Sequence, residues 1–255
     1  METTKLVDFH CHLDLFPNHL ELIKECEQLG IKTLTVTNAP RVWRQNQLFV
    51  KDCQHVRVAL GLHPQLAHAY ANELHLFEQY LPEVRYIGEV GLDGAPECAN
   101  TLEIQRRVFR TILDLCAQSG GKVLTVHSRR AAREVIELIG NHLPPTKGRI
   151  VLHWFTGSIK DALTAVEAGC YFSVNIKMLT SPQKIKLIER LPQDRILTES
   201  DGPFIKSGKH LMCPKDIGRV IEKIAPIWSV DETTAALIIR NNLRKLLCEP
   251  SPLKN

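Results

Sequence analysis

The sequence predicts an α/β fold of the (β/α)8 barrel type. Along its 255 residues, short apolar segments alternate with helical segments eight times. Strands that are separated by one helix each pair in parallel, and closed barrels of this kind commonly have about 250 residues. An open, doubly wound sheet is the main alternative. No linker, repeat or low-complexity segment divides the chain, so we expect residues 1–255 to form a single domain.

Eight segments are expected to contain the strands, because they are short, apolar and rich in β-branched or aromatic residues. These segments are 6–14, 31–37, 56–62, 86–90, 122–126, 149–152, 170–174 and 195–198.

The helices are expected where apolar residues recur at helical spacing. A glycine stop, Gly30, ends the first of them. The predicted helices are 18–30, 41–53, 72–80, 102–118, 131–142, 159–168, 182–190, 213–227 and 231–247. The segment 203–214, which contains Gly208, is expected to be an irregular loop.

Composition limits the class of protein only loosely. The net charge of +4 and the pI near 8.6 permit an anionic ligand without requiring one. The eight cysteines are scattered and form no Cys-x-x-Cys pair, which favours reduced thiols in a cytoplasm. We see no secretory signal and no apolar run near the roughly 20 residues that a membrane span needs.

Polar side chains at the predicted strand ends carry the functional argument. His10 and His12 share one side of their strand because strand side chains alternate. Further strand ends supply more such groups, and in a barrel all of them lie on the carboxyl-terminal rim, where barrel enzymes hold their active sites. The candidates are His10, His12, His63, Glu89, His127, His153 and Asp201. A single histidine of this kind is more often a hydrogen-bonded core residue, but so many of them together predict a metal site.

The number of ligands leaves the number of metal ions open. Three histidines and one aspartate suffice for one ion, whereas four histidines, a glutamate and an aspartate suffice for two, with Glu89 as the bridge. Two cations about 3.5–4 Å apart can activate water and stabilise a leaving oxygen in a displacement. Asp201 is placed to take the proton of the water as general base. Imidazole ligands suit Zn, Mn, Ni or Fe better than Mg alone.

The sequence resembles the TatD-type deoxyribonucleases, a family of the metal-dependent, amidohydrolase-like barrels. Matching motifs follow in the family's order from one end of the chain to the other. They are 9–14, 61–64, 87–93, the Gln105–Phe109 helix, 127–129, 153–157, 199–203 and a late 242–244. The resemblance implies two divalent ions (Mg, Mn or Zn), one held by His10, His12, Glu89 and Asp201 and the other by Glu89, His127 and His153. It also implies a phosphodiesterase that acts on DNA ends as an exonuclease.

Four segments, HCHLDLFP, HSRRAA, LHWFTGS and TESDGPF, are similar to one branch of the family, the TatD-like component of the Qat anti-phage defence system. This similarity implies partner proteins of a defence system. The chain departs from the usual family pattern at Gly94, at Gln65, where histidine is common, and at 212–214. These positions are expected in substrate-facing loops, so the substrate is less certain than the metal chemistry.

Several residues near the rim have two interpretations. Arg129 is predicted to bind a phosphate, whereas Arg130 is equally a solvated helix residue. His63 either contacts substrate or orients a ligand. Trp154 is expected to pack behind the barrel rather than to stack on a base. A basic stretch at 206–210 meets either a nucleic-acid backbone or solvent.

We therefore carry three functional hypotheses. The first is a two-metal deoxyribonuclease that acts on single-stranded DNA or 3′ ends. The second is a metal-dependent amide or ester hydrolase, for example an aminoacyl-tRNA deacylase; Glu89, in place of a lysine that could be carbamylated, argues modestly against it. The third is a metal-stabilised binding subunit of a defence complex.

Overall fold

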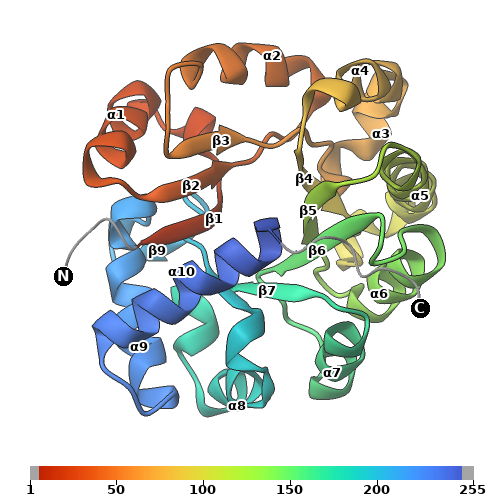
Figure 1. Cartoon of the computed structure of the whole chain (residues 1–255). Coiled ribbons are helices and arrows are strands. Elements are labelled where there is room, and N and C mark those ends of the chain that lie inside the picture. Colours follow the sequence, from red (N-terminus) through yellow and green to blue (C-terminus); the bar gives the residue numbers. More distant parts are fainter. Residues whose placement is uncertain (1–5, 249–255) are drawn as a thin grey trace.

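The protein is a parallel barrel surrounded by helices, as the computed structural model in Figure 1 shows. Residues 6–248 are described. The eight barrel strands pair in parallel with their sequence neighbours in two sets, β1-β2-β3 and β4-β5-β6-β7-β8. They are β1 (Val7–Cys11), β2 (Lys32–Thr35), β3 (Val56–Val58), β4 (Tyr86–Gly91), β5 (Lys122–His127), β6 (Gly148–His153), β7 (Tyr171–Val174) and β8 (Ile196–Thr198).

Backbone hydrogen bonds close the ring at both junctions between the two sets of strands. Between β3 and β4, Leu60 N donates to Tyr86 O (3.0 Å) and Gly88 N donates to Leu60 O (2.9 Å). Between β8 and β1, the chain just after β8 pairs with the end of β1, because Asp201 N donates to His10 O (3.0 Å). The predicted closed barrel is therefore confirmed, and the open sheet is excluded.

Ten α-helices within residues 6–248 cover the strands. Their ends follow ordinary capping chemistry: α1 ends at Gly30 with φ +66°, and Ser158 and Asp161 form a reciprocal capping box for α7. The helices are α1 (His19–Leu29), α2 (Pro40–Phe49), α3 (Ala67–Tyr70), α4 (Leu74–Tyr80), α5 (Leu102–Ser119), α6 (Ala132–His142), α7 (Ile159–Glu167), α8 (Pro182–Arg190), α9 (Ile217–Ile227) and α10 (Glu232–Cys248).

Four expected elements differ from the structure. The helix predicted over 72–80 begins with a 3-10 turn, η4 (Ala71–Glu73), before α4. The helix predicted over 41–53 ends at Phe49, where Val50 N donates to Gln47 O in a final turn. The expected loop 203–214 contains a two-stranded hairpin, β9 (Lys206–Ser207) with β10 (His210–Leu211), around Gly208 at φ +64°. The last predicted helix but one begins with a short 3-10 turn, η9 (Pro214–Asp216), before α9.

The core lies between the strands and the helices and inside the barrel. All residues of β1, β7 and β8 are buried, as expected for parallel strands that are covered on both faces. The largest fully buried side chains include Phe77, Phe109, Phe155 and Phe172. This continuous core holds the strand ends, and with them the polar rim, in fixed positions.

Helix α10 crosses the amino-terminal end of the barrel (Figure 1). Asn242 Nδ2 donates to Gln193 O (2.7 Å) and Ile196 O (2.8 Å) beside β8, and the Arg85 guanidinium next to β4 donates to Leu247 O. The amino-terminal end is thus covered, whereas the carboxyl-terminal end remains open. None of the helices within 6–248 is long and apolar enough to cross a membrane.

Candidate metal centre at the carboxyl-terminal rim

The structure brings the predicted candidates together at the carboxyl ends of the strands. Six of the eight barrel strands place one or two of them: His10 lies in β1 and His12 just after it, His63 follows β3, Glu89 lies in β4, His127 and His153 are the last residues of β5 and β6, and Asp201 follows β8. Glycine is required at Gly61, two residues before His63, because a Cβ there would lie 1.9 Å from Thr37 O. Because Gly61 has no side chain, the backbone can pass close to Thr37 on its way to the rim.

Glu89 occupies the centre of this cluster. One carboxylate oxygen, Oε2, lies 3.4 Å from His10 Nε2 and 3.3 Å from His12 Nε2. The other, Oε1, lies 2.6 Å from His127 Nδ1 and 3.4 Å from His153 Nε2. A carboxylate whose two oxygens face two different sets of imidazoles has the arrangement that a bridging ligand needs.

His63 belongs to the same cluster, because its Nε2 lies 3.3 Å from Glu89 Oε1. The sequence suggested only contact with substrate or orientation of a ligand for this residue. In the structure, His63, Glu89 and His127 offer ligand atoms that lie within 4.8 Å of one another. Direct coordination by His63 is therefore a third possibility.

Asp201 completes the cluster from the side of β8. Its Oδ1 lies 3.9 Å from His10 Nε2 and 3.8 Å from His12 Nε2, too far for hydrogen bonds but close enough for a shared ion. His10 Nε2 and both ring nitrogens of His12 are buried without a hydrogen-bond partner within the described residues. Buried polar atoms normally have a partner, so these unpaired nitrogens point to one that is not protein.

The donor set fits divalent cations. Within 4.8 Å of one another lie the ligand atoms of His10, His12 and Asp201, and also those of His10, Glu89 and His153. Neutral imidazole with carboxylate suits Zn, Mn, Fe or Ni. The residues therefore fit one or two such ions, with Glu89 between the groups.

A second set of residues holds the ring nitrogens in place. Thr125 Oγ1 lies 2.7 Å from His10 Nδ1, and Glu199 Oε2 lies 3.1 Å from His153 Nδ1. Asp93 Oδ2 lies 3.1 Å from His127 Nε2. Such partners fix the tautomer and the orientation of a metal-binding imidazole.

Sequence reasoning did not identify the roles of Glu199 and Asp93. Both lie in motifs that were noted, Glu-Ser-Asp and Gly-Leu-Asp, and Glu199 precedes Asp201 by two residues. The sequence does offer one signal for these roles: each residue is an acid near a strand end, beyond the acids already assigned as metal ligands. Asp8 also positions the site, because it accepts from Ser200 N (3.0 Å) and from the Ser200 hydroxyl, which ties β1 to the segment that carries Asp201.

The electrostatics are those of a crowded, buried site. Burial raises the pKa of the Asp201 carboxyl well above its usual value, and the neighbouring Glu199 and Glu89 carboxylates raise it further against the opposing effect of His153. Burial also works to raise the pKa of Glu89, but His63 and His10 outweigh it and hold that pKa well below the usual range. Neighbouring carboxyl groups whose pKa values are shifted in opposite directions are common at functional sites.

A pocket of about 730 Å³ opens above the cluster. Its walls carry three cations, Arg129, Arg130 and Lys184, and two aromatic side chains, Trp154 and Phe204. The volume lies within the range of about 300–1,000 Å³ typical of ligand sites. Phe204 is 57% exposed, and its ring packs edge-on against His12 with centroids 4.9 Å apart.

The prediction that Trp154 packs behind the barrel is wrong, because Trp154 lines the pocket. Strand alternation does not apply there: β6 ends at His153, and Trp154 has φ +38°. Arg130 (φ +52°) and Asp201 (φ +46°) also have left-handed backbones, which are uncommon for residues other than glycine. Three of the four such residues within 6–248 thus border this pocket, as expected of backbone strain that is held at a functional site.

Arg129 is half-exposed and pairs with acids at the edge of the pocket. Its Nη1 lies 2.9 Å from Glu97 Oε1 and 3.6 Å from Asp93 Oδ2. Gln65 donates from Nε2 to the same Asp93 oxygen (2.7 Å). The basic stretch 206–210 is not part of the lining, and its His210 Nε2 instead lies 2.7 Å from Asp216 Oδ2.

Comparison with known proteins gives consistent similarities over the whole barrel. A family model described as TatD related DNase matches residues 7–248. The putative deoxyribonuclease TATDN3 of Mus musculus is 33% identical over 94% of this chain and 87% of its own length. An uncharacterized metal-dependent hydrolase of Buchnera aphidicola is 28% identical over 94% of this chain and 98% of its own. The crystal structure of YJJV, a TatD homolog from Escherichia coli, has a TM-score of 0.85 with 23% identity, over 97% of this chain and all of that one.

Proposed function

The chain belongs to the TatD related DNase family, and from this premise we propose that it is a two-metal phosphodiesterase that cleaves DNA as an exonuclease, at single strands or 3′ ends. It is a metal-dependent hydrolase of the TatD type. The observation that carries the two-metal proposal is the position of Glu89, whose two oxygens face separate groups of imidazoles. One barrel accounts for residues 6–248, and we treat 1–255 as one catalytic domain.

In this proposal, His10, His12, Glu89 and Asp201 hold one ion, and Glu89, His127 and His153 hold the other. Two such ions, whether Mg, Mn or Zn, would supply an activated water and stabilise the leaving oxygen. The imidazole-rich ligands favour Mn or Zn over Mg.

The remaining chemistry belongs to the side chains of the chain itself. Asp201 takes the proton of the attacking water, a role that requires its ionised form. Burial works against that form, whereas a divalent cation bound beside the carboxyl would lower its pKa and restore the form. Asp201 therefore acts as both a ligand and the base.

The walls of the pocket suit a nucleic acid. Arg129, Arg130 and Lys184 supply positive charge for phosphates, and most nucleic-acid affinity comes from such contacts. Trp154 and Phe204 offer ring faces on which bases can stack without sequence preference. His63 and Arg129 both line the pocket, and His63 Nε2 lies 3.3 Å from Glu89 Oε1, so we assign both residues to the phosphate that is cleaved.

Asp201→Asn tests this function. The change keeps the shape and one oxygen ligand but removes the basicity of the group. We expect metal to stay bound, DNA affinity to change little, and hydrolysis to fall at least about a hundredfold. End-labelled single-stranded DNA with a 5′ or a 3′ label, duplex DNA and RNA are the substrates to compare, with aminoacyl-tRNA as the substrate of a deacylase.

Near-normal turnover by Asp201→Asn with metal bound would remove the base assignment. Faster release of amino acid from aminoacyl-tRNA than of nucleotides from DNA would favour an amide or ester hydrolase. Absence of hydrolysis in the metal-loaded protein, together with capture of a partner, would leave only a binding subunit.

We further propose a role in anti-phage defence, together with other proteins of such a system. The support is the similarity of four segments, among which HSRRAA and LHWFTGS carry the pocket residues Arg129 and Trp154. The eight free cysteines fit the reducing cytoplasm in which such a system acts. Phage plating on cells with the wild-type system and with Asp201→Asn tests this role, and equal protection by both would refute a catalytic contribution.

A further inference from the structure

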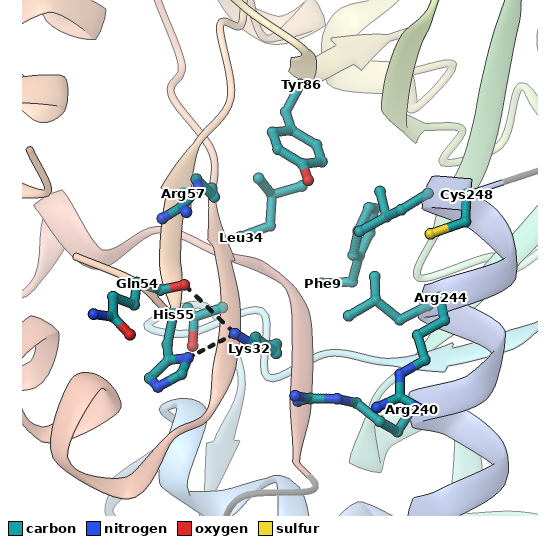
Figure 2. Close-up of a pocket in the computed structure, with 13 residues that line it drawn as sticks. Phe9, Lys32, Leu34, Gln54, His55, Arg57, Tyr86, Arg240, Arg244 and Cys248 are labelled. Carbon is teal, nitrogen blue, oxygen red and sulfur yellow. Dashed lines mark hydrogen bonds between the residues drawn. The ribbon is translucent and has the colours of Figure 1, made fainter.

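A second cavity lies at the opposite end of the barrel from the metal centre. It has a volume of about 310 Å³ and is bounded by the amino-terminal ends of β2, β3 and β4 and by the second half of α10 (Figure 2). Lys32 is the first residue of β2 and Tyr86 the first of β4, so these groups belong to the amino-terminal mouth. Nothing in the proposed hydrolase chemistry uses this cavity.

The charge of the lining is one-sided. Lys32, Arg57, Arg240 and Arg244 line the cavity, and none of its thirteen lining residues is Asp or Glu. The acid that acts on Lys32 is Glu27, but its carboxylate already accepts from three backbone N–H groups of residues 54–56. Figure 2 shows Arg240 extending from α10 toward β2, and the Lys32 amine directed at Gln54 O and His55 Nδ1.

Arg240 is the incompletely partnered cation of this cavity, whereas Lys32 Nζ lies 2.6 Å from His55 Nδ1 and Arg57 donates to Cys53 O and Val56 O. Arg240 Nη1 is buried and has no hydrogen-bond partner within the described residues. Burial lowers the pKa of Arg240, and neighbouring Arg244 lowers it further. The pKa of Lys32 is lowered by burial and then by Arg240 and Arg57. Cations that repel one another, one with a buried and unpaired N–H group, are stabilised by an anion between them.

The rest of the lining is apolar and partly aromatic. Phe9, Leu34, Leu243 and Leu247 form part of the wall, and the ring of Tyr86 stands at one end of it (Figure 2). The cavity volume is near the lower end of the range for small-molecule sites, about 300–1,000 Å³. A bare inorganic anion would leave this apolar surface uncovered, whereas an anion with a flat ring would cover it.

We propose that this cavity is a binding site for a small phosphate ester that carries a flat ring, of the nucleoside monophosphate class. The phosphate accepts hydrogen bonds from Arg240, Lys32 and Arg244, and the ring lies against Phe9 and Tyr86. Arginine suits this role because its planar guanidinium binds phosphate through two parallel hydrogen bonds. Helix α10 is hydrogen-bonded to residues at the amino-terminal ends of β8 and β4, so a bound ligand also stabilises the packing of α10 on the barrel.

The test is calorimetric titration of the full-length, metal-free protein in EDTA with deoxythymidine monophosphate, inorganic phosphate and thymidine. Removal of metal suppresses binding of phosphate at the other end of the barrel. We expect the monophosphate to bind more tightly than either inorganic phosphate or thymidine. Arg240→Gln should weaken its binding at least about tenfold, the effect of losing one hydrogen bond to a charged group.

Two control variants remove one positive charge elsewhere. Arg129→Gln changes the pocket at the metal centre, and Arg110→Gln changes an exposed position on α5. Both should bind the monophosphate within about twofold of wild type. Arg240→Lys, which keeps the charge, should recover part of the affinity, which a purely structural defect would not do. Thermal unfolding followed by circular dichroism checks that each variant is folded.

Four results would overturn the proposal. The first is equal affinity of the wild type and a folded Arg240→Gln, and the second is loss of binding in Arg129→Gln instead, which would place the ligand at the metal centre. The third is absence of binding at millimolar monophosphate, and the fourth is binding of thymidine as tight as that of the monophosphate.

Discussion

Glu199 is expected to control metal affinity without contacting a metal. Its buried carboxylate accepts from four donors: His153 Nδ1 (3.1 Å), Trp154 N (3.0 Å), Asn175 Nδ2 (2.7 Å) and the Ser173 hydroxyl. The bond to Nδ1 fixes the tautomer of His153 in which Nε2, the nitrogen that faces Glu89, has no proton and is free to bind an ion.

Glu199→Gln keeps the shape of the side chain and changes one acceptor oxygen into an NH₂ donor. That NH₂ group cannot face Trp154 N and Asn175 Nδ2, because neither donor can become an acceptor in place. It must therefore face the Ser173 hydroxyl, which can rotate, and His153 Nδ1, which must give up its proton. The proton then sits on Nε2 of His153 and has to leave before a metal can bind.

The expected loss is about 10- to 100-fold in metal affinity, the usual effect of removing such an orienting partner. At about 1.4 kcal/mol for each factor of ten, this is about 1.4–2.8 kcal/mol. Titration calorimetry with Mn²⁺ or Zn²⁺ near neutral pH measures it, and the ion held by His153 should be weakened more than the other.

Glu73→Gln is the matched control. Glu73 is also a buried carboxylate, 3% exposed, but it accepts from the backbone N and the guanidinium of Arg41, and it does not line the pocket. This variant should lose stability and keep wild-type metal affinity. A folded Glu199→Gln protein with unchanged affinity would refute the tautomer argument, and equal loss in both variants would trace the effect to general destabilisation.

Two further predictions concern Glu89 at the metal centre and Glu27 at the other end of the barrel. Glu89→Ala should lose both ions together, whereas His153→Ala should mainly weaken the binding of one. Elemental analysis after reconstitution with metal measures both effects. A single ion bound by the wild type at saturating metal would contradict the bridged site. Glu27 is expected to make stability acid-sensitive: burial works to raise its pKa, but N–H groups of residues 54–56 outweigh this and lower it below its ordinary value of 4.5. The ionised carboxylate therefore stabilises the fold above about pH 4.5, and this contribution is lost as the pH falls through the lowered pKa. Denaturant unfolding between about pH 6 and 3 should show a smaller acid loss for Glu27→Gln than for wild type, and parallel curves would contradict the assignment.

The barrel and its rim were predictable because both depend on local periodicity. Short apolar strands alternate with amphipathic helices, and parallel strands place their carboxyl ends on the same side. Once eight such units are recognised, residues as distant as His10 and Asp201 must be close together, and the structure places Asp201 N 3.0 Å from His10 O. No further long-range information is then needed to predict that the candidate ligands lie together at the rim.

What could not be predicted depends on backbone geometry outside the strands. Trp154 was assigned by strand alternation, which ends at His153, and the left-handed turn there sends the side chain into the pocket. The hairpin in 203–214 is only two residues long on each side, too short for a pattern to emerge from the sequence. Glu199 follows β8 and reaches past β7 to His153 at the end of β6, a contact that no spacing within the chain encodes.

Gln65 acts on the metal centre through a chain of hydrogen bonds. Gln65 donates to Asp93, Asp93 faces His127, and His127 Nδ1 lies against Glu89. Burial works to raise the pKa of Asp93, but His127, Ala95 N and Gln65 outweigh it and hold that pKa well below its usual range. A neutral amide at position 65 therefore leaves the charge of Asp93 to be shared by His127 and Arg129, whereas a protonated histidine there would compete with both. Gln65 thus links the substrate side of the pocket to the imidazole beside Glu89, so variation at this loop position is expected to alter substrate preference and the basicity of His127 together.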